Sequence, residues 1–188
     1  ALTESKKDTF RYTLVDQHGA ETTATMAINV VGALPTSEVK LSGGTQTVTL
    51  DAILQEVLKG AASADTVTLS GRALSGDTFD GGGGSDTLVL DGSGDNQIAV
   101  KNTEVVRGGA GDDRVEVLGP GTSGVSISTG GGDDALALGG DFQFVSASLS
   151  EDNLVISTEY TDSSDAAAEA ESVSITVDGH ATAPISSL

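Results

Sequence analysis

The sequence predicts an all-β chain whose central part is a parallel β-solenoid, flanked by antiparallel hairpins and a short N-terminal capping helix. Three observations lead to this prediction. A glycine-rich motif that ends in aspartate recurs, alternating apolar residues follow each copy, and large side chains are scarce. Aromatic residues make up only 3% of the 188 residues and Trp is absent, so the core must consist of Val, Leu, Ile and Ala. Layers of such small side chains suit coils that stack on one another.

The motif reads Gly-Gly-x-Gly-x-Asp and is most complete at residues 108–113. Further copies are found at residues 81–86, at 129–134 with Thr129 in the first position, and in degraded form at 60–65. Their aspartates, Asp65, Asp86, Asp113 and Asp134, stand 21, 27 and 21 residues apart. Similar windows at such intervals predict successive coils of a solenoid. We assign the six extra residues of the 27-residue step to the acidic segment 91–96, at the edge of the solenoid opposite the motifs. There the segment is either a solvated turn or an extra calcium site.

Apolar residues hold fixed positions around every copy of the motif. They stand two places before the motif, and two and four places after its aspartate. The positions are Leu58, Phe79, Val106 and Ile127 before it, then Val67, Leu88, Val115 and Leu136, then Leu69, Leu90, Val117 and Leu138. Apolar residues spaced by two lie on one face of a strand. Each copy is therefore expected to be a turn that leads into a half-buried strand.

Glycine turns that carry aspartate have the chemistry of a calcium site. Neighbouring strands lie about 4.8 Å apart and calcium lies about 2.4 Å from its oxygen ligands, so an ion between two stacked turns reaches both. Glycine lets backbone carbonyls converge on the ion, and stacked aspartates would repel one another without it. The alternative is an ordinary β-turn that needs no metal. The predicted ligands are the carboxylates of Asp86, Asp113 and Asp134, with Asp112 and Asp133 beside them, and the backbone of Gly81, Gly83, Gly108, Ala110, Gly130 and Gly132.

The motif resembles the RTX, or haemolysin-type calcium-binding, repeat, and residues 103–109 are similar to the lead-in that precedes such repeats. The resemblance implies a parallel β-roll with calcium held between its turns. Repeats of that family follow one another every nine residues with turns on both edges. Here the motifs are 21 or 27 residues apart, which predicts calcium along one edge only. We expect one ion between Asp86 and Asp113 and a second between Asp113 and Asp134.

The N-terminal segment predicts a β-hairpin in front of the solenoid. Residues 9–16 and 22–31 alternate as strands do, with a turn at 17–20 between them. This pair resembles the last two strands of VCBS or cadherin-like repeats. A lone hairpin is only marginally stable, so we expect it to need a neighbouring sheet. We assign residues 1–34 to this partial domain and its linker, and residues 35–188 to the solenoid.

The solenoid is expected to begin with a cap and to end with antiparallel strands. Residues 45–50 predict a strand, and Asp51 would then cap a short helix over residues 52–59 that ends at Gly60. Its apolar face would consist of Ile53, Leu54, Val57 and Leu58, and it would cover the open first coil. The predicted C-terminal cap contains a hairpin of residues 142–149 and 153–160, an acidic loop at 161–171 and a strand at 172–177.

Charge and missing motifs restrict the function. The formal charge is −19, from 28 acidic and 9 basic residues, which argues against nucleic acid as a partner. The chain has no cysteine. It also has no run of about 20 apolar residues, so we expect no insertion into a membrane. Neither His-Glu-x-x-His nor Gly-x-Ser-x-Gly occurs, and His18 and His180 are expected to be solvated. We therefore expect no enzymatic activity from this chain.

Together these features and the resemblance predict a calcium-stabilised structural segment of a secreted bacterial surface protein, of adhesin or matrix type. The resemblance implies type I secretion and folding on export into calcium. The expected partners are calcium ions, with other copies of the chain or neighbouring domains of a longer chain as further possibilities. Two alternatives stay open. The chain is a self-assembling surface-layer or filament subunit, or it is the RTX module of a secreted enzyme whose catalytic domain lies elsewhere.

Overall fold

The computed structural model describes residues 6–15, 19–30, 36–122, 124–150, 153–178 and 185–187. These residues form seventeen strands and no helix. None of them therefore belongs to a helix long and apolar enough to span a membrane. The chain divides into two compact units, residues 1–35 and residues 36–188.

The first unit contains the predicted β-hairpin. Strand β1 (Lys6–Val15) pairs antiparallel with β2 (Glu21–Val30), so that Lys6 lies opposite Val30 and Val15 opposite Glu21. Five of the ten residues of β2 are the β-branched Thr, Ile or Val, which favour a strand. His18 and Pro35, which marks the predicted linker, lie outside the described residues, as does His180.

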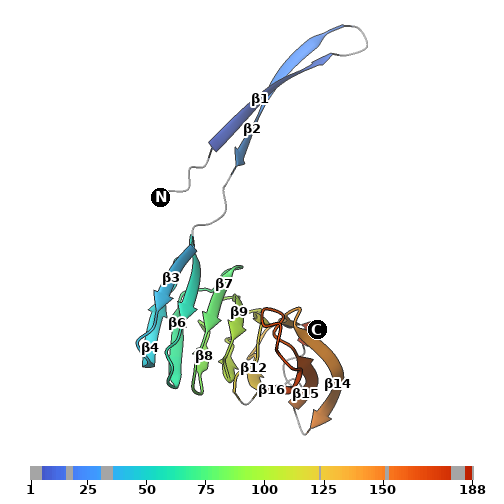
Figure 1. The fold of residues 1–188 in the computed structure, drawn as a ribbon. Coiled ribbons are helices and arrows are strands. Elements are labelled where there is room, and N and C mark those ends of the chain that lie inside the picture. The colour runs from blue at the N-terminus through green and yellow to red at the C-terminus, as the bar shows by residue number, and fades with distance from the viewer. Residues whose placement is uncertain are drawn as a thin grey trace. The chain divides into compact units, whose positions relative to one another are not determined.

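The second unit is a parallel β-solenoid of about five turns. Each coil adds one strand to each of two sheets, and Figure 1 shows successive strands side by side along the stack. The seven-stranded sheet runs β3 (Thr36–Lys40), β5 (Gln55–Lys59), β7 (Asp77–Asp80), β9 (Gln97–Lys101), β11 (Arg114–Val117), β13 (Asp134–Leu138) and β17 (Ile185–Ser187). The eight-stranded sheet runs β4 (Gly44–Thr49), β6 (Asp65–Ser70), β8 (Thr87–Val89), β10 (Val105–Arg107), β12 (Val125–Ser128), β16 (Glu171–Asp178), β15 (Asn153–Tyr160) and β14 (Phe142–Ser150).

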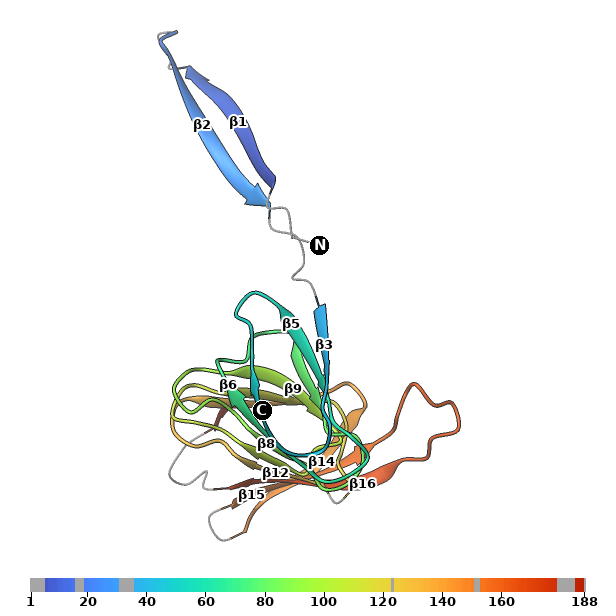
Figure 2. The same ribbon diagram turned by 90° about the vertical axis from the view of Figure 1, so that its left-hand side faces the viewer.

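The eight-stranded sheet changes from parallel to antiparallel pairing at its C-terminal end. β16 is parallel to β12, whereas β15 is antiparallel to β16 and β14 is antiparallel to β15. The predicted hairpin and the strand that follows it are thus confirmed. Residues 161–170 join β15 to β16 as a long loop that projects from the coils in Figure 2.

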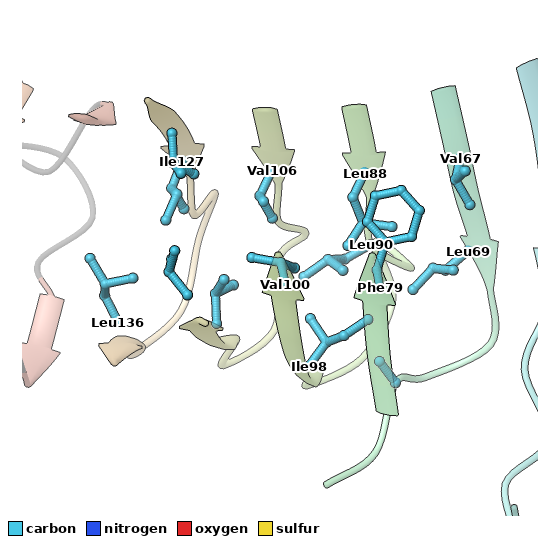
Figure 3. Packing of buried hydrophobic residues seen from close by; sticks show 14 of the residues in the cluster. Val67, Leu69, Phe79, Leu88, Leu90, Ile98, Val100, Val106, Ile127 and Leu136 are labelled. Carbon is cyan, nitrogen blue, oxygen red and sulfur yellow. The ribbon is translucent and has the colours of Figure 1, made fainter. Parts of the chain in front are cut away.

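The core fills the space between the two sheets with apolar columns, each coil adding one side chain to a column. One column of the seven-stranded sheet is Val39, Leu58, Phe79, Val100, Val117 and Leu138. In the other sheet Leu88, Val106 and Ile127 follow one another along the stack, as Figure 3 shows. The apolar positions that flank the motifs are buried as predicted, except Leu138, which is half-buried. Each such side chain contributes roughly 1.5–3 kcal/mol when it leaves water.

The predicted helix over residues 52–59 is wrong, because residues Gln55–Lys59 form strand β5 between β3 and β7. A helical face requires Ile53 to be inside, yet Ile53 is 67% exposed. The strand instead buries Glu56 and Leu58, which are two residues apart. Hydrogen bonding to strands on both sides, and packing of Leu58 between Val39 and Phe79, outweigh the local helical pattern. In the described second unit, nothing pairs with the outer edges of β3 and β4.

Candidate metal-binding edges

Each coil of the solenoid has two turns, and the turns line two opposite edges. At the first edge the chain passes from the seven-stranded to the eight-stranded sheet, and at the second edge it returns. The first-edge turns that are discussed below are residues 60–64, 81–86, 102–104 and 118–122. The corresponding second-edge turns are residues 90–96, 108–113 and 129–133.

The three motif aspartates do not share an edge. Asp86 precedes β8 at the first edge, whereas Asp113 and Asp134 stand at the starts of β11 and β13 at the second edge. The predicted placement of all three motifs on one edge is therefore wrong, and Asp86 and Asp113 are not positioned to share an ion. Asp113 and Asp134 do lie in neighbouring coils, because the Asp113 backbone N–H donates to Asp134 Oδ1 at 2.9 Å.

The 27-residue step is one coil plus half a coil, and contains no insertion. Glu104 is the first-edge neighbour of Asp86, and Asp113 stands nine positions after Glu104, on the opposite edge. Segment 91–96, expected to be extra and on the far edge, is a turn on the same edge as Asp113. The Ala110 N–H donates to the Gly92 carbonyl at 3.3 Å, which stacks this turn directly on the next one.

Asn96 and Glu104 lie in the same turn positions as the motif aspartates, although neither was predicted from the sequence. Strand register places Asn96 beside Asp113, and Glu104 beside Asp86. A signal for Asn96 exists, because Asp-Gly-Ser-Gly-Asp-Asn at residues 91–96 has the glycine and acid spacing of residues 108–113. Glu104 follows no glycine motif, and only the apolar Val106 two places later indicates its register.

At the first edge, each of three stacked coils places one buried carboxylate next to that of the neighbouring coil. We call this row of carboxylates the first-edge ladder. Its members are Asp65, Asp86 and Glu104, which are 1%, 1% and 6% exposed. Each accepts a backbone N–H from the coil before it. Asp65 Oδ1 accepts from Gly44 at 2.7 Å, Asp86 Oδ1 from Asp65 at 2.7 Å, and Glu104 Oε2 from Asp86 at 2.6 Å. These carboxylates thereby satisfy backbone donors where the strand ladder ends.

The second edge has an inner ladder of Asn96, Asp113 and Asp134 and an outer ladder of Asp95, Asp112 and Asp133. In the inner ladder Asp113 Oδ1 accepts from the Asn96 N–H at 3.0 Å and from Asn96 Nδ2 at 2.8 Å. In the outer ladder the Asp112 N–H donates to Asp95 Oδ1 at 2.9 Å and the Asp133 N–H donates to Asp112 Oδ1 at 2.8 Å. The inner residues are buried and the outer ones exposed, because adjacent residues at a strand start face opposite ways.

The predicted backbone ligands are also divided between the edges. Gly81 and Gly83 belong to the first edge, whereas Gly108, Ala110, Gly130 and Gly132 belong to the second. The turns stack closely on both edges. The Gly83 N–H donates to the Ala61 carbonyl at 3.0 Å, and the Gly131 N–H to the Gly109 carbonyl at 2.9 Å.

Asp86 differs from Asp65 and Asp113 in its second carboxylate oxygen. The Oδ2 atoms of Asp65 and Asp113 each accept an N–H of their own turn, from Ala61 and Gly109 respectively, at 2.8 Å. The corresponding Gly82 N–H instead donates to Asp80 Oδ1 at 3.2 Å. Asp86 Oδ2 is consequently buried without a hydrogen-bond partner.

The buried carboxylates are crowded by like charges. Burial raises the pKa of Asp86 to about 6, and the Glu104, Asp65 and Asp80 carboxylates add to the shift, against the opposing Asp65 N–H bond. Burial also raises the pKa of Asp134, with a further contribution from its acidic neighbours. No Lys or Arg of the described chain forms an ion pair with Asp65, Asp86 or Glu104.

We expect the free energy of unfolding to fall as pH rises from 4 to 7 in a chelating buffer, and Asp86 to cause part of this fall. Its pKa rises on folding from an ordinary 3.8 to about 6, so its contribution is present below about pH 4 and lost as pH passes 6. The loss is on the order of 2 kcal/mol. Urea denaturation at each pH measures it, with Asp86→Asn as the control that lacks the titration. Equal slopes in both proteins would contradict the assignment.

The donor chemistry of both edges fits calcium, which prefers carboxylate and carbonyl oxygens. In the described residues, however, no three His, Cys, Asp or Glu side chains form a group arranged to hold a metal. Both Asp113 oxygens already accept N–H donors, whereas Asp86 Oδ2 does not. Asp86 therefore offers an oxygen that a cation would reach without displacing a hydrogen bond.

The fold and its edges define a parallel β-solenoid with acidic, glycine-rich turns. Comparison of the chain with protein-family models, with curated proteins and with solved structures found no match.

Proposed function

We propose that this chain is a calcium-stabilised structural segment of a secreted bacterial surface protein, of adhesin or extracellular-matrix type. The observation that carries the proposal is the first-edge ladder of Asp65, Asp86 and Glu104, whose buried carboxylates have no basic partner among the described residues. Buried charges are costly unless they are paired or bind a metal. A divalent cation would remove this cost and would link one coil to the next.

Both edges offer ligands for such an ion. At the first edge these are Asp86 and the backbone of Gly81 and Gly83. At the second edge they are the inner and outer aspartates of two coils, Asp113, Asp134, Asp112 and Asp133, with the backbone of Gly108, Ala110, Gly130 and Gly132. Calcium would neutralise the stacked carboxylates there. The role of the ion is structural, since its ligands come together only when the coils stack.

The charge and the turn chemistry support an extracellular setting. Turns that resemble the RTX repeat present calcium ligands on open edges, and open sites of this kind suit the 10⁻⁴–10⁻³ M affinities of extracellular modules. The −19 charge of the chain opposes compaction without cations. A chain of this kind folds fully where calcium is abundant, which is outside the cell.

Isothermal titration calorimetry with calcium tests the proposal. We expect saturable binding by the full chain, and fewer bound ions for Asp86→Asn and for Asp134→Asn, one from each edge. Asp165→Asn is the matched control, because Asp165 is an exposed acid in the loop between β15 and β16. No heat of binding in millimolar calcium, or the same loss in the control, would refute the proposal.

A further inference from the structure

The eight-stranded sheet has an unpaired edge at each end, formed by β4 and β14. Among the described strands β4 pairs only with β6, and β14 only with β15. Each terminal strand therefore exposes a row of backbone N–H and C=O groups. Such edges recruit further strands unless charges, proline or bulges protect them.

Both terminal strands lack charge and proline, although the chain is strongly acidic. The nine residues of β14 and the six of β4 include no Asp, Glu, Lys, Arg or Pro. β14 also carries large exposed apolar side chains, with Phe144 60%, Val145 56% and Leu149 69% exposed. A bulge interrupts β14 between Phe144 and Ser146, and residues 146–150 beyond it pair regularly with β15. By contrast β3, the terminal strand of the other sheet, carries Glu38 and Lys40.

The two edges also match in direction. Two successive antiparallel pairings, β16 with β15 and β15 with β14, return β14 to the direction of β4 and the other coil strands. A copy shifted along the stack would therefore place its β4 parallel to β14, in the pairing that joins the coils themselves.

The core faces of the two strands match in chemistry. Leu149 and Ala147 lie opposite Leu154 and Ile156, whose face of the sheet is the core face. Val48 of β4 lies beside the buried Leu69 and so also faces the core, where it is half-buried. Placing β4 against β14 would continue one apolar row from copy to copy.

We propose that the chain binds a second copy of itself head to tail, with β14 of one copy pairing in parallel with β4 of the next. This contact joins two different surfaces, so it leaves a free edge at each end and repeats into open chains of solenoids. The inference needs the solenoid fold and does not depend on which residues bind calcium.

Sedimentation velocity of the full chain in millimolar calcium, over a range of protein concentrations, tests the inference. We expect the mean mass of the wild type to rise with concentration beyond that of a dimer. Ala147→Lys on β14 and Thr47→Lys on β4 should each give monomers. An equimolar mixture of the two variants should form 1:1 dimers and nothing larger, because one variant keeps a working β4 and the other a working β14.

Ser174→Lys is the control, since Ser174 is exposed on β16 in the interior of the same sheet, and it should associate like the wild type. Circular dichroism checks that each variant keeps its β signal, and Ser148→Lys replaces Ala147→Lys if that signal is lost. A wild type that stays monomeric overturns the inference. So does a Thr47→Lys variant that still dimerises, which would indicate symmetric pairing of β14 with itself, or a control that fails to associate.

Discussion

Chelation of calcium is expected to lower the melting temperature of this protein by about 10–20 °C. An ion whose concentration is 100 times its dissociation constant stabilises the state that binds it by about 2.7 kcal/mol. Two such ions, one at each edge, together contribute about 5 kcal/mol. Each kcal/mol shifts the melting temperature of a domain of this size by about 2–4 °C. Circular dichroism melts in millimolar calcium and in EGTA measure the shift.

Magnesium and an edge variant provide the controls for this experiment. Magnesium keeps its water ligands and demands a stricter geometry than calcium, so it should restore little of the lost stability. Asp86→Asn removes the carboxylate with the unpartnered oxygen, and its melting temperature should depend less on calcium than that of the wild type. Identical melts of the wild type in calcium and in EGTA would show that the ladders are stable without metal.

Gly130→Ala is expected to destabilise the solenoid by about 2–4 kcal/mol. Gly130 has a φ of 90°, and a Cβ there would collide with the carbonyl oxygen of Gly109 in the preceding coil. The left-handed conformation alone costs an alanine about 1–2 kcal/mol, and relief of the collision must separate two stacked turns. Urea denaturation in calcium measures the loss.

The next residue provides a matched control. A Cβ on Gly131 meets nothing closer than Ala110 Cα at 3.9 Å, and Gly131 does not have a positive φ. Gly131→Ala should therefore stay within about 0.5 kcal/mol of the wild type. Equal losses for the two substitutions would mean that the turns do not stack as closely as described.

The strands and the core could largely be read from the sequence. Phe79, Leu88 and Val115 are buried because apolar residues spaced by two must share a strand face. The same reasoning failed for residues 52–59, where Ile53, Leu54, Val57 and Leu58 suit a helix equally well. Periodicity over eight residues cannot separate the two structures, and the neighbouring strands β3 and β7 decided between them.

The candidate site was only partly predictable. The sequence predicted glycine turns that lead into aspartates, and Asp113 and Asp134 lie in adjacent coils as expected. Asp86 was placed on the wrong edge because both edges are built from glycine turns that lead into an inward acid, and a motif does not show which sheet follows it. Glu104 was missed because its turn has three residues and no glycine.

By itself the sequence determined that the chain is a β-solenoid with apolar columns and acidic turns, because alternation and repeat spacing are local properties of the chain. Only the tertiary structure decided which acids meet. Asp86 stands 18 residues before its neighbour Glu104, and 27 before Asp113 on the opposite edge. Whether two acids share an edge depends on the number of half coils between them, since each half coil moves the chain to the other side of the core.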